Sequence, residues 1–389
     1  MNNTQLYRAF NSPDLILGFY QYGNCHQIAT ATGFNAPEVM LKARMEGFER
    51  RVSSTPPAIA AYDSANSIKK KGSDYVDPDE FVPLLDFQRK AHNLKPFKRD
   101  KKYRWVQGFS WETKSPVYVP VDLVYYDFQS RDRLYYANSS GVAAHYDRNA
   151  AVRAAFLELV ERDAIMRSWF TKKGLVEIRF DEDEENYESY YADFFINRQK
   201  KWKSFRRELN VFYLNSVSGT ATFLATITGS SWPHFVCGAS ATMCEGLYSY
   251  AAAAKKAIEE AEANFEAYFG VNNASNMCEK NCYSPSDHAI MYCSDNNLSH
   301  IFYLYERKPK TRLDRLSVAD TTEVNLEKML HEYSCVVVDM TPECSSRQVM
   351  RVLSPKLLPI SFGHKLAHFT HKSLYGYDVR ETTFPHFFP

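Results

Sequence analysis

The sequence predicts a mixed α/β protein of the α+β class. Three segments have a helical pattern rich in glutamate and alanine, and short runs of apolar, β-branched and aromatic residues lie between them. Strands that alternate with long helices in this order indicate a mixed architecture. The chain has 389 residues, of which 45% are hydrophobic, so it can bury a large core.

The predicted helices have recognisable ends. They cover about residues 37–51, 148–170 and 248–269. Asn35 and Asp147 stand where an N-cap side chain would accept a hydrogen bond from the first turn. Gly270 follows the third helix, and glycine is the usual residue at a helix C-terminus.

Strands are predicted wherever apolar and β-branched residues cluster. The predicted strands are 105–109, 116–124, 134–137, 175–180, 211–214, 222–227, 235–239 and 336–338. The polar stretch 53–79 contains Pro56 and Pro57 and predicts a loop, and 272–297 predicts an irregular segment. Neither stretch has the composition of a disordered linker, so no domain boundary is predicted there.

Composition excludes several classes of protein. The formal net charge is +1, whereas a general nucleic-acid binder has a strong basic excess. No run approaches the ~18 apolar residues of a membrane helix, and the N-terminus does not have the pattern of a signal peptide. The 8 cysteines in so long a chain do not indicate a disulfide framework. We expect a reduced, cytoplasmic protein that binds neither nucleic acid nor membrane.

Two of the predicted helices carry a pair of glutamates three residues apart, directly followed by an arginine. The four glutamates are Glu46, Glu49, Glu158 and Glu161. Residues at this spacing share a helical face. One such pattern is typical of an exposed helix, but the second pair lies among Phe156, Leu157 and Val160, which predicts burial. Buried carboxylates need a metal or a cation, and Mg²⁺ shared with phosphate oxygens is the natural ion.

Other readings of the polar residues remain open. A di-iron bundle also pairs carboxylates, but it usually has Glu-x-x-His, and this chain is rich in predicted strands. The common phosphate-binding loops are absent from the sequence. A zinc site would need the four residues Cys278, Cys282, His288 and Cys293, whose spacing departs from the usual pattern. His364, His368 and His371 would share one face if they were helical, as ligands or as ordinary polar residues.

Several stretches together resemble the YcaO family, and they occur in the order of that family. They are 46–50, the loop Asn138-Ser139-Ser140-Gly141-Val142-Ala143-Ala144-His145, the Glu158-x-x-Glu161-Arg162-Asp163 helix, Asp287-His288 with Tyr292, and Ser354 to His364. The resemblance spans roughly residues 30–364. It implies a YcaO fold with mixed sheets and glutamate-bearing helices around an ATP site, as one domain over 1–375.

The resemblance also implies roles for individual residues. Glu46, Glu49, Glu158 and Glu161 would hold Mg²⁺ and, through it, the phosphates of ATP. Arg162 would contact phosphate, and Glu260, Lys256 and Ser12 would complete the nucleotide site. The chain departs from the family at 31–33, where Ala-Thr-Gly replaces Gly-Lys-Gly. It also departs at Ala263 or Asn264, where glutamine is common, and at Lys356, where the family has glycine.

The last residues narrow the expected activity. YcaO enzymes that form azolines typically end in Pro-x-Pro-x-Pro, and here Pro385 and Pro389 fit while Phe387 replaces the middle proline. The resemblance therefore implies a tail, 376–389, that reaches the active site, with the carboxylate of Pro389 ordering the site or assisting proton transfer. Proline stiffens such a tail.

The activity expected from the resemblance is ATP-dependent cyclodehydration. Cys, Ser or Thr residues of a ribosomally made precursor peptide would become thiazolines or oxazolines. A separate E1-like or ThiF-like partner would bring the substrate, since no leader-binding module is recognisable before residue 37. An FMN-dependent azoline dehydrogenase would join the hetero-oligomer. The alternatives are a YcaO enzyme that forms thioamides or macrocyclic amidines, and a non-catalytic ATP-binding scaffold subunit.

Overall fold

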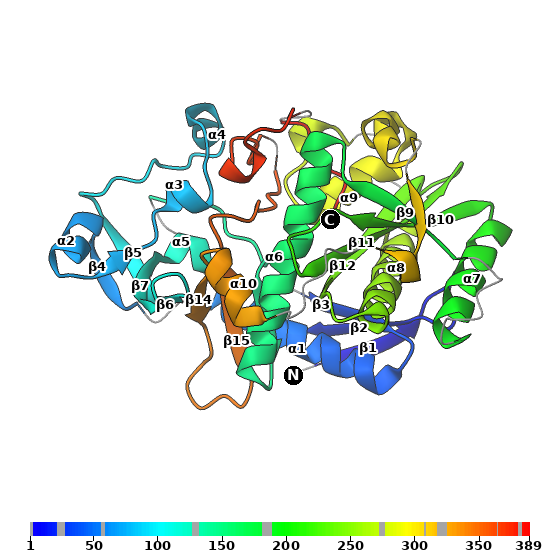
Figure 1. Ribbon diagram of the computed structural model, residues 1–389, viewed down its shortest axis with the longest axis horizontal. Helices are drawn as coiled ribbons and strands as arrows, with labels where there is room; N and C mark the ends of the chain where they lie inside the picture. Colours follow the sequence, from blue (N-terminus) through cyan, green and yellow to red (C-terminus); the bar gives the residue numbers. More distant parts are fainter. Residues whose placement is uncertain are drawn as a thin grey trace.

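The described part of the chain forms three β-sheets with helices between them (Figure 1). The computed structural model describes residues 3–21, 28–55, 59–126, 132–180, 189–271, 277–306, 309–316, 325–363, 365–379 and 383–389. No helix in this part of the chain is long and apolar enough to cross a membrane.

A small antiparallel sheet at the N-terminus carries the first glutamate helix. Its strands are β1 (Asn3–Arg8), β2 (Ile16–Gln21) and β3 (Ile28–Gly33). Helix α1 (Ala36–Ser54) packs on β2 and β3, and Asn35 caps it by accepting a hydrogen bond from the amide of Glu38 at 3.3 Å. Tyr20 of β2 packs directly against Gly47, so α1 lies close to the sheet.

A seven-stranded sheet forms the second unit, with the strand order β5-β7-β6-β14-β15-β8 and β4 paired to β6. Its strands are β4 (Ala61–Ser64), β5 (Asp74–Tyr75), β6 (Lys102–Ser110), β7 (Ser115–Pro120), β8 (Val142–His145), β14 (Val336–Asp339) and β15 (Gln348–Leu353). Four short helices lie around it: α2 (Ala65–Lys70), α3 (Pro78–Phe81), α4 (Asp86–Ala91) and α5 (Val121–Val124). Its β8 strand leads directly into the second glutamate helix.

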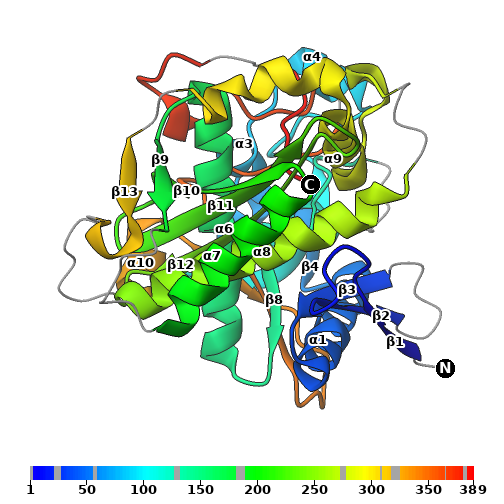
Figure 2. The same cartoon turned by 90° about the vertical axis from the view of Figure 1, so that its right-hand side faces the viewer.

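The third unit is a five-stranded sheet with the order β12-β11-β10-β9-β13. Its strands are β9 (Leu175–Arg179), β10 (Arg207–Leu214), β11 (Thr220–Gly229), β12 (Phe235–Met243) and β13 (Lys310–Arg312). Helix α8 (Leu247–Phe269) crosses β11 and β12, and α7 (Ser189–Ser204) packs on β10 (Figure 2). Helix α8 is the third of the predicted helices.

The long helix α6 (Arg148–Thr171) stands between the two large sheets (Figure 1). Asp147 caps it by accepting a hydrogen bond from the amide of Ala150 at 2.8 Å. It contacts β8 and β15 on one side and β12 on the other, which explains why its buried residues surround the helix. The remaining helices are α9 (Pro285–Cys293), α10 (Leu326–Glu332) and the 3-10 helices η2 (Glu279–Asn281), η3 (Asp295–Leu304), η4 (Leu313–Arg315) and η5 (Lys372–Leu374).

The structure confirms the three helices and most of the strands, and it corrects four predictions. The segment 121–124 is a helical turn and 134–137 is not a strand. The predicted loop 53–79 contains β4, α2 and β5, and the predicted irregular segment 272–297 contains α9. Strands β1 to β3, β8, β13 and β15 and helix α7 were not predicted. The cysteines in the described residues are free thiols.

Candidate active site

The two glutamates of α1 have different neighbours. Glu46 pairs with Arg50 at 2.5 Å and accepts a hydrogen bond from the backbone of Thr30, while burial raises its pKa. Glu49 accepts a hydrogen bond from the backbone of Ala144 in β8; burial raises its pKa well above its usual range, and the charges of Glu158 and Glu46 raise it further. Glu49 is therefore the glutamate of α1 whose charge interacts with the second pair.

The glutamates of α6 are held by the loop before the helix and by an arginine. Glu158 accepts a hydrogen bond from the amide of Gly141 at 3.1 Å. The guanidinium of Arg162 lies 3.5 Å from Glu158 and 3.3 Å from Glu161, which is 8% exposed. Burial raises the pKa of Glu158; Arg162 opposes this rise and Glu161 adds to it.

Gly141 is required at its position. It has a φ of +77°, and a Cβ atom there would lie 2.5 Å from the carbonyl oxygen of Val352 and 2.8 Å from Leu159. We expect Gly141→Ala to lower the free energy of unfolding by about 2 kcal/mol or more, because neither the backbone nor the space accepts a side chain. Chemical denaturation would measure it. A loss below about 0.5 kcal/mol would contradict this account of the loop.

Helix α8 brings a fifth carboxylate to the same place. Gly238 on β12 leaves no room for a Cβ atom, which would lie 2.4 Å from the amide nitrogen of Ala261, so the helix and strand are in close contact. Glu260 accepts a hydrogen bond from the amide of Ala239 at 3.1 Å. Burial raises the pKa of Glu260 to about 7, and the neighbouring charge of Glu161 contributes to the rise.

The raised pKa of Glu260 makes the stability of the ligand-free protein depend on pH. The folded state holds this proton to about pH 7, whereas the unfolded state releases it near pH 4.5. Stability therefore falls as pH rises through 7. Between about pH 5 and 7 we expect the wild type to lose melting temperature relative to Glu260→Gln as the pH rises, because glutamine does not ionise. An equal slope in both proteins would contradict the prediction.

The buried histidines act in the opposite direction. Burial lowers the pKa of His288 and His368 to about 4 each and that of His371 to about 3. They stay neutral in the folded state while the unfolded chain takes up protons near pH 6.5, so their contribution to stability is lost as pH falls through that range. Both proteins contain these histidines, so the difference between the wild type and Glu260→Gln isolates the carboxyl.

Arg162 lies at the centre of the carboxylates. Although burial opposes it, the charges of Glu161, Glu158 and Glu260 raise the pKa of the guanidinium. Its Nε and Nη1 atoms are buried and make no hydrogen bond within the described part of the chain. The ring of Phe388 lies under the guanidinium, 4.5 Å from its carbon. The site thus combines several carboxylates with a cation whose donors are available to an anion.

The C-terminal residues lie beside Arg162 and are anchored in the core. Phe387 is 1% exposed and makes edge contacts with Trp169, Phe235 and Tyr292. It occupies the position where the family's tail has its middle proline, and its ring fills a core pocket that a proline would leave partly empty. The next residue, Phe388, is the one that contacts Arg162.

The segment that resembles the family around α9 holds this tail. The Nδ1 atom of His288 donates to the carbonyl of His386 at 2.9 Å, and the hydroxyl of Tyr292 donates to the carbonyl of Pro385 at 2.6 Å. The Nε2 atom of His386 in turn donates to the carbonyl of Ser361 at 3.0 Å. The tail therefore has a fixed position beside α6, and Pro389 lines a small cavity with Cys237 and other residues.

The site fits Mg²⁺ that is shared with phosphate. Within the described ranges, no three His, Cys, Asp or Glu side chains gather closely enough to hold an ion by themselves. Mg²⁺ usually has one or two carboxylate ligands and takes its other ligands from water and phosphate. The glutamates on facing helices supply such pairs, and the free donors of Arg162 suit phosphate oxygens. The ligands that the glutamates offer are all oxygen atoms, as Mg²⁺ requires.

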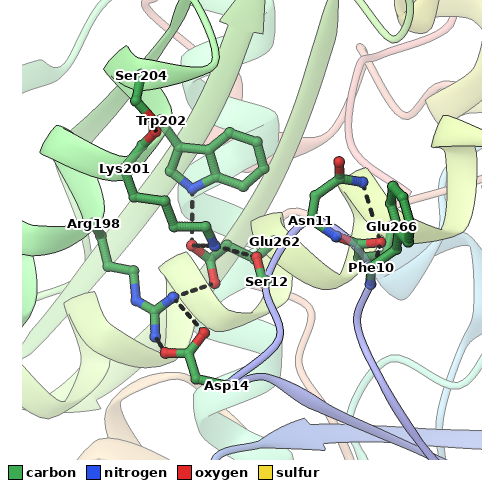
Figure 3. A network of polar contacts seen from close by, with 10 residues as sticks. All are labelled: Phe10, Asn11, Ser12, Asp14, Arg198, Lys201, Trp202, Ser204, Glu262 and Glu266. Atoms are coloured by element: carbon green, nitrogen blue, oxygen red, sulfur yellow. Dashed lines mark hydrogen bonds and ion pairs between the residues drawn. The ribbon is translucent and has the colours of Figure 1, made fainter.

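Two of the predicted site residues lie at the edge of this arrangement or outside it. Lys256 is exposed, one turn before Glu260 on α8, and its charge lowers the pKa of that carboxyl. Ser12 is fully buried in a different network, where its hydroxyl accepts a hydrogen bond from Lys201, which also pairs with Glu262 at 3.2 Å (Figure 3). In the described part of the chain, Ser12 makes its hydrogen bond to Lys201 and not to the glutamates of α1 and α6.

The other candidate ligands are the histidines near the C-terminus and the residues of the possible zinc site, and their contacts are structural. His368 and His371 lie in non-helical chain, so they do not form one helical face, and His364 lies outside the described residues. His368 contacts the hydroxyl of Tyr135 at 3.2 Å. Of the zinc candidates, His288 is used by the tail, and Cys278 is exposed whereas Cys282 and Cys293 are buried.

No role was predicted from the sequence for two charged residues on α6 and β15, Asp163 and Arg351. Asp163 is 1% exposed and accepts hydrogen bonds from the amide of Leu358 and from Arg167, both at 2.7 Å, which fixes the segment after β15 against α6. Arg351 on β15 is 3% exposed, and its charge acts on Glu158. The sequence signal for Arg351 is a single charged residue between apolar residues of one strand, which indicates a buried charge with a specific environment.

The fold matches solved structures at low sequence identity. A heterocyclase in complex with substrate and cofactor has a TM-score of 0.70 at 17% identity, over 98% of this chain and 54% of that one. The YcaO protein from Methanopyrus kandleri, bound with AMPPCP and Mg²⁺, has 0.65 at 17% identity, over 91% and 85%. The E. coli microcin synthetase McbBCD complex with pro-MccB17 bound has 0.66 at 15%, over 91% and 88%.

The chain thus spans about half of the first of these proteins, 54% of its length. Among curated proteins, none has significant sequence similarity to the chain. A family model described as YcaO cyclodehydratase, binding ATP and Mg²⁺, matches residues 31–358, which include all the glutamates of the site. With this match over most of its length, the chain belongs to the YcaO cyclodehydratase family.

Proposed function

We propose that the protein is the catalytic subunit of an ATP-dependent cyclodehydratase that forms thiazolines and oxazolines in a ribosomally synthesised precursor peptide. The observation that supports this most directly is the convergence of carboxylates from α1, α6 and α8 around the buried Arg162. The match to the YcaO cyclodehydratase model supports the same activity. So does the position of the tail, whose Phe388 contacts Arg162.

In the proposed reaction, the sulfur or oxygen of a Cys, Ser or Thr side chain attacks the preceding backbone carbonyl carbon and loses its proton. The former carbonyl oxygen takes the γ-phosphoryl group of ATP, and ADP leaves. The amide nitrogen then forms the C=N bond as phosphate departs with the oxygen and the N–H proton is lost. The sum is peptide plus ATP giving azoline, ADP and phosphate.

The protein's contribution is positioning and charge neutralisation. Mg²⁺, when bound, supplies positive charge next to the phosphate oxygens. Glu46, Glu49, Glu158 and Glu161 hold it in the proposal. Arg162 donates hydrogen bonds to phosphate from its Nε atom, which makes no hydrogen bond in the described residues, and from Nη1, which lies 3.3 Å from Glu161.

Glu260 and Lys256 complete the nucleotide side of the proposed site. Glu260 is placed beside Arg162 by its hydrogen bond to the amide of Ala239, and Lys256 adds a cation at the exposed edge. We also propose that Ser12 contributes to the nucleotide site. Its hydroxyl is hydrogen-bonded to the ammonium group of Lys201.

The carboxylate of Pro389 is proposed to order the site or to assist proton transfer. Pro389→Ala retains the carboxylate in place, whereas one added glycine after Pro389 displaces it. We expect near-normal turnover in the first protein and a loss of about 100-fold in the second, the usual scale of general acid–base assistance. Equal turnover in both would overturn this role.

The proposed assembly is a hetero-oligomer in the cytoplasm. An E1-like or ThiF-like protein binds the leader of the precursor, and an FMN-dependent dehydrogenase oxidises azolines to azoles. The test combines this protein with its partner, the precursor peptide, Mg²⁺ and ATP, followed by mass spectrometry. Loss of one water mass per ring supports cyclodehydration. Exchange of oxygen for sulfur identifies a thioamide enzyme instead, and an unmodified peptide from a folded complex favours a scaffold.

A further inference from the structure

Arg351 is a buried cation within the seven-stranded sheet. On β15 it pairs with Val142 of β8 on one side and with Val338 of β14 on the other. The residue is 3% exposed, and the neighbouring positions of the strand are apolar. An ionised side chain in such a place has a high desolvation cost, so it requires compensation from the surrounding groups.

Backbone carbonyls provide only part of that compensation. The Nη1 atom of Arg351 donates to the carbonyl of Val124 at 3.2 Å and to that of Asn138 at 2.8 Å. Its Nε atom is buried and makes no hydrogen bond, and no ion pair is formed with an acidic residue of the described chain. Arg351 lines a cavity of ≈ 40 Å³ with Asn138, Ser140 and Leu159.

Charges of the candidate active site also act on Arg351. Burial lowers the pKa of Arg351 to about 10, while Tyr135, Glu158 and Glu49 are among the groups that oppose this decrease. The effect is mutual, because the charge of Arg351 lowers the pKa of Glu158. The guanidinium therefore interacts electrostatically with a glutamate from α1 and a glutamate from α6.

A second connection runs through the loop before β8. Arg351 holds the carbonyl of Asn138, whose side chain accepts from the amide of Ser140 at 3.0 Å and donates to the carbonyl of Ile360 at 2.9 Å. The amide of Gly141 at the end of this loop donates to Glu158. The guanidinium thus supports the loop that orients the carboxylate.

We propose that Arg351 is a positioning residue of the active site: it balances the charge of the glutamates of α1 and α6, fixes the Asn138–Gly141 loop, and thereby sets the affinity for a magnesium-bound nucleoside triphosphate. Without this positive charge, the glutamates would repel the triphosphate more strongly. The inference rests on the proposed function, and it adds a residue that lies outside the glutamate-bearing helices.

The test measures binding of AMPPCP with Mg²⁺ by calorimetry, without peptide, in folded full-length protein. We expect Arg351→Met to weaken binding at least about tenfold, and Arg351→Lys, which keeps the charge, to stay within about threefold of the wild type. The matched control is Arg207→Met. Arg207 is also buried, at 6% exposed, and donates to the carbonyls of Pro233, Ser231 and Trp232. Its loss should lower stability and leave nucleotide affinity unchanged.

The outcomes separate this inference from the proposed function. If the wild-type protein binds no magnesium-bound nucleotide, the proposed function fails. If it binds and Arg351→Met retains its affinity, Arg351 has only a structural role and the inference is overturned. Equal losses in the Met and Lys variants would overturn the charge-balancing role. Should Arg351→Met not fold, Arg351→Gln is the neutral variant, and the same tenfold loss or its absence decides.

Discussion

Glu158→Gln should abolish turnover without unfolding the protein. The substitution keeps the size of the side chain and removes its charge at the point where α1 and α6 face each other. We expect peptide-dependent ATP hydrolysis to fall at least about 100-fold, the scale observed when one electrostatic contact to a transition state is removed. The melting temperature of the ligand-free protein should stay the same or rise, because burial and Glu161 disfavour the ionised form of Glu158.

An exposed glutamate on α1 provides the control for this experiment. Glu38 lies in the first turn of the helix, where its side chain is 56% exposed and pairs with Lys42 at 2.5 Å. Glu38→Gln should leave ATP hydrolysis unchanged. Turnover within about threefold of the wild type in folded Glu158→Gln would remove Glu158 from the metal-binding set, whatever the other glutamates do.

Glu262→Ala should have the largest effect on stability. Glu262 on α8 is fully buried and lies 3.3 Å from Arg198, 3.2 Å from Lys201 and 2.8 Å from the indole nitrogen of Trp202 (Figure 3). Arg198 also pairs with Asp14 of the N-terminal segment. Removing one carboxylate leaves the buried Arg198, the half-buried Lys201 and an indole N–H without this partner, which costs about 3–5 kcal/mol. Denaturant unfolding measures this loss.

A surface ion pair between two other elements is the comparison for Glu262. Glu245 pairs with Arg153 at 2.6 Å, and both side chains are more than a third exposed, at 47% and 40%. Glu245→Ala should lower the free energy of unfolding by no more than about 1 kcal/mol. If the two substitutions had equal effects, burial would not be the origin of the large loss at Glu262.

The sequence predicted the helices that carry the site well, because their signals are local. Asn35 and Asp147 cap α1 and α6 as expected, and Gly270 follows α8. The spacing of the glutamates places each pair on one helical face. That these faces meet was an inference from the family resemblance. Neither composition nor spacing reports which helices pack together.

The predictions that failed depended on tertiary contacts. Leu134 and Tyr135 are buried as strand residues would be, but the amide of Leu134 donates to the side chain of Asp122 at 2.8 Å instead of to a neighbouring strand. Strand β3 was not predicted because it contains small residues such as Ala29. These small residues allow α1 to pack closely on the strand. Such strands have little of the apolar signal on which strand prediction depends.

The remaining features that were not predicted are contacts between residues that are far apart in the sequence. Ser12 and Lys201 are separated by 189 positions, yet their side chains are hydrogen-bonded. The electrostatic interaction between Arg351 and Glu158 likewise joins two segments that are far apart in the sequence. A single sequence contains no signal for such pairs, whereas a charged residue inside an apolar strand indicates only that some partner exists.

The buried position of Phe387 also bears on the synthesis of the protein. The ring completes a core made by α6, β12 and α9, and the neighbouring Phe388 supports Arg162. Translation produces residues 383–389 after all of these elements. While it is still attached to the ribosome, the nascent chain therefore exposes an apolar pocket at Trp169 and Tyr292, and Arg162 lacks its aromatic support. Enzyme activity should appear only after this segment has left the exit tunnel.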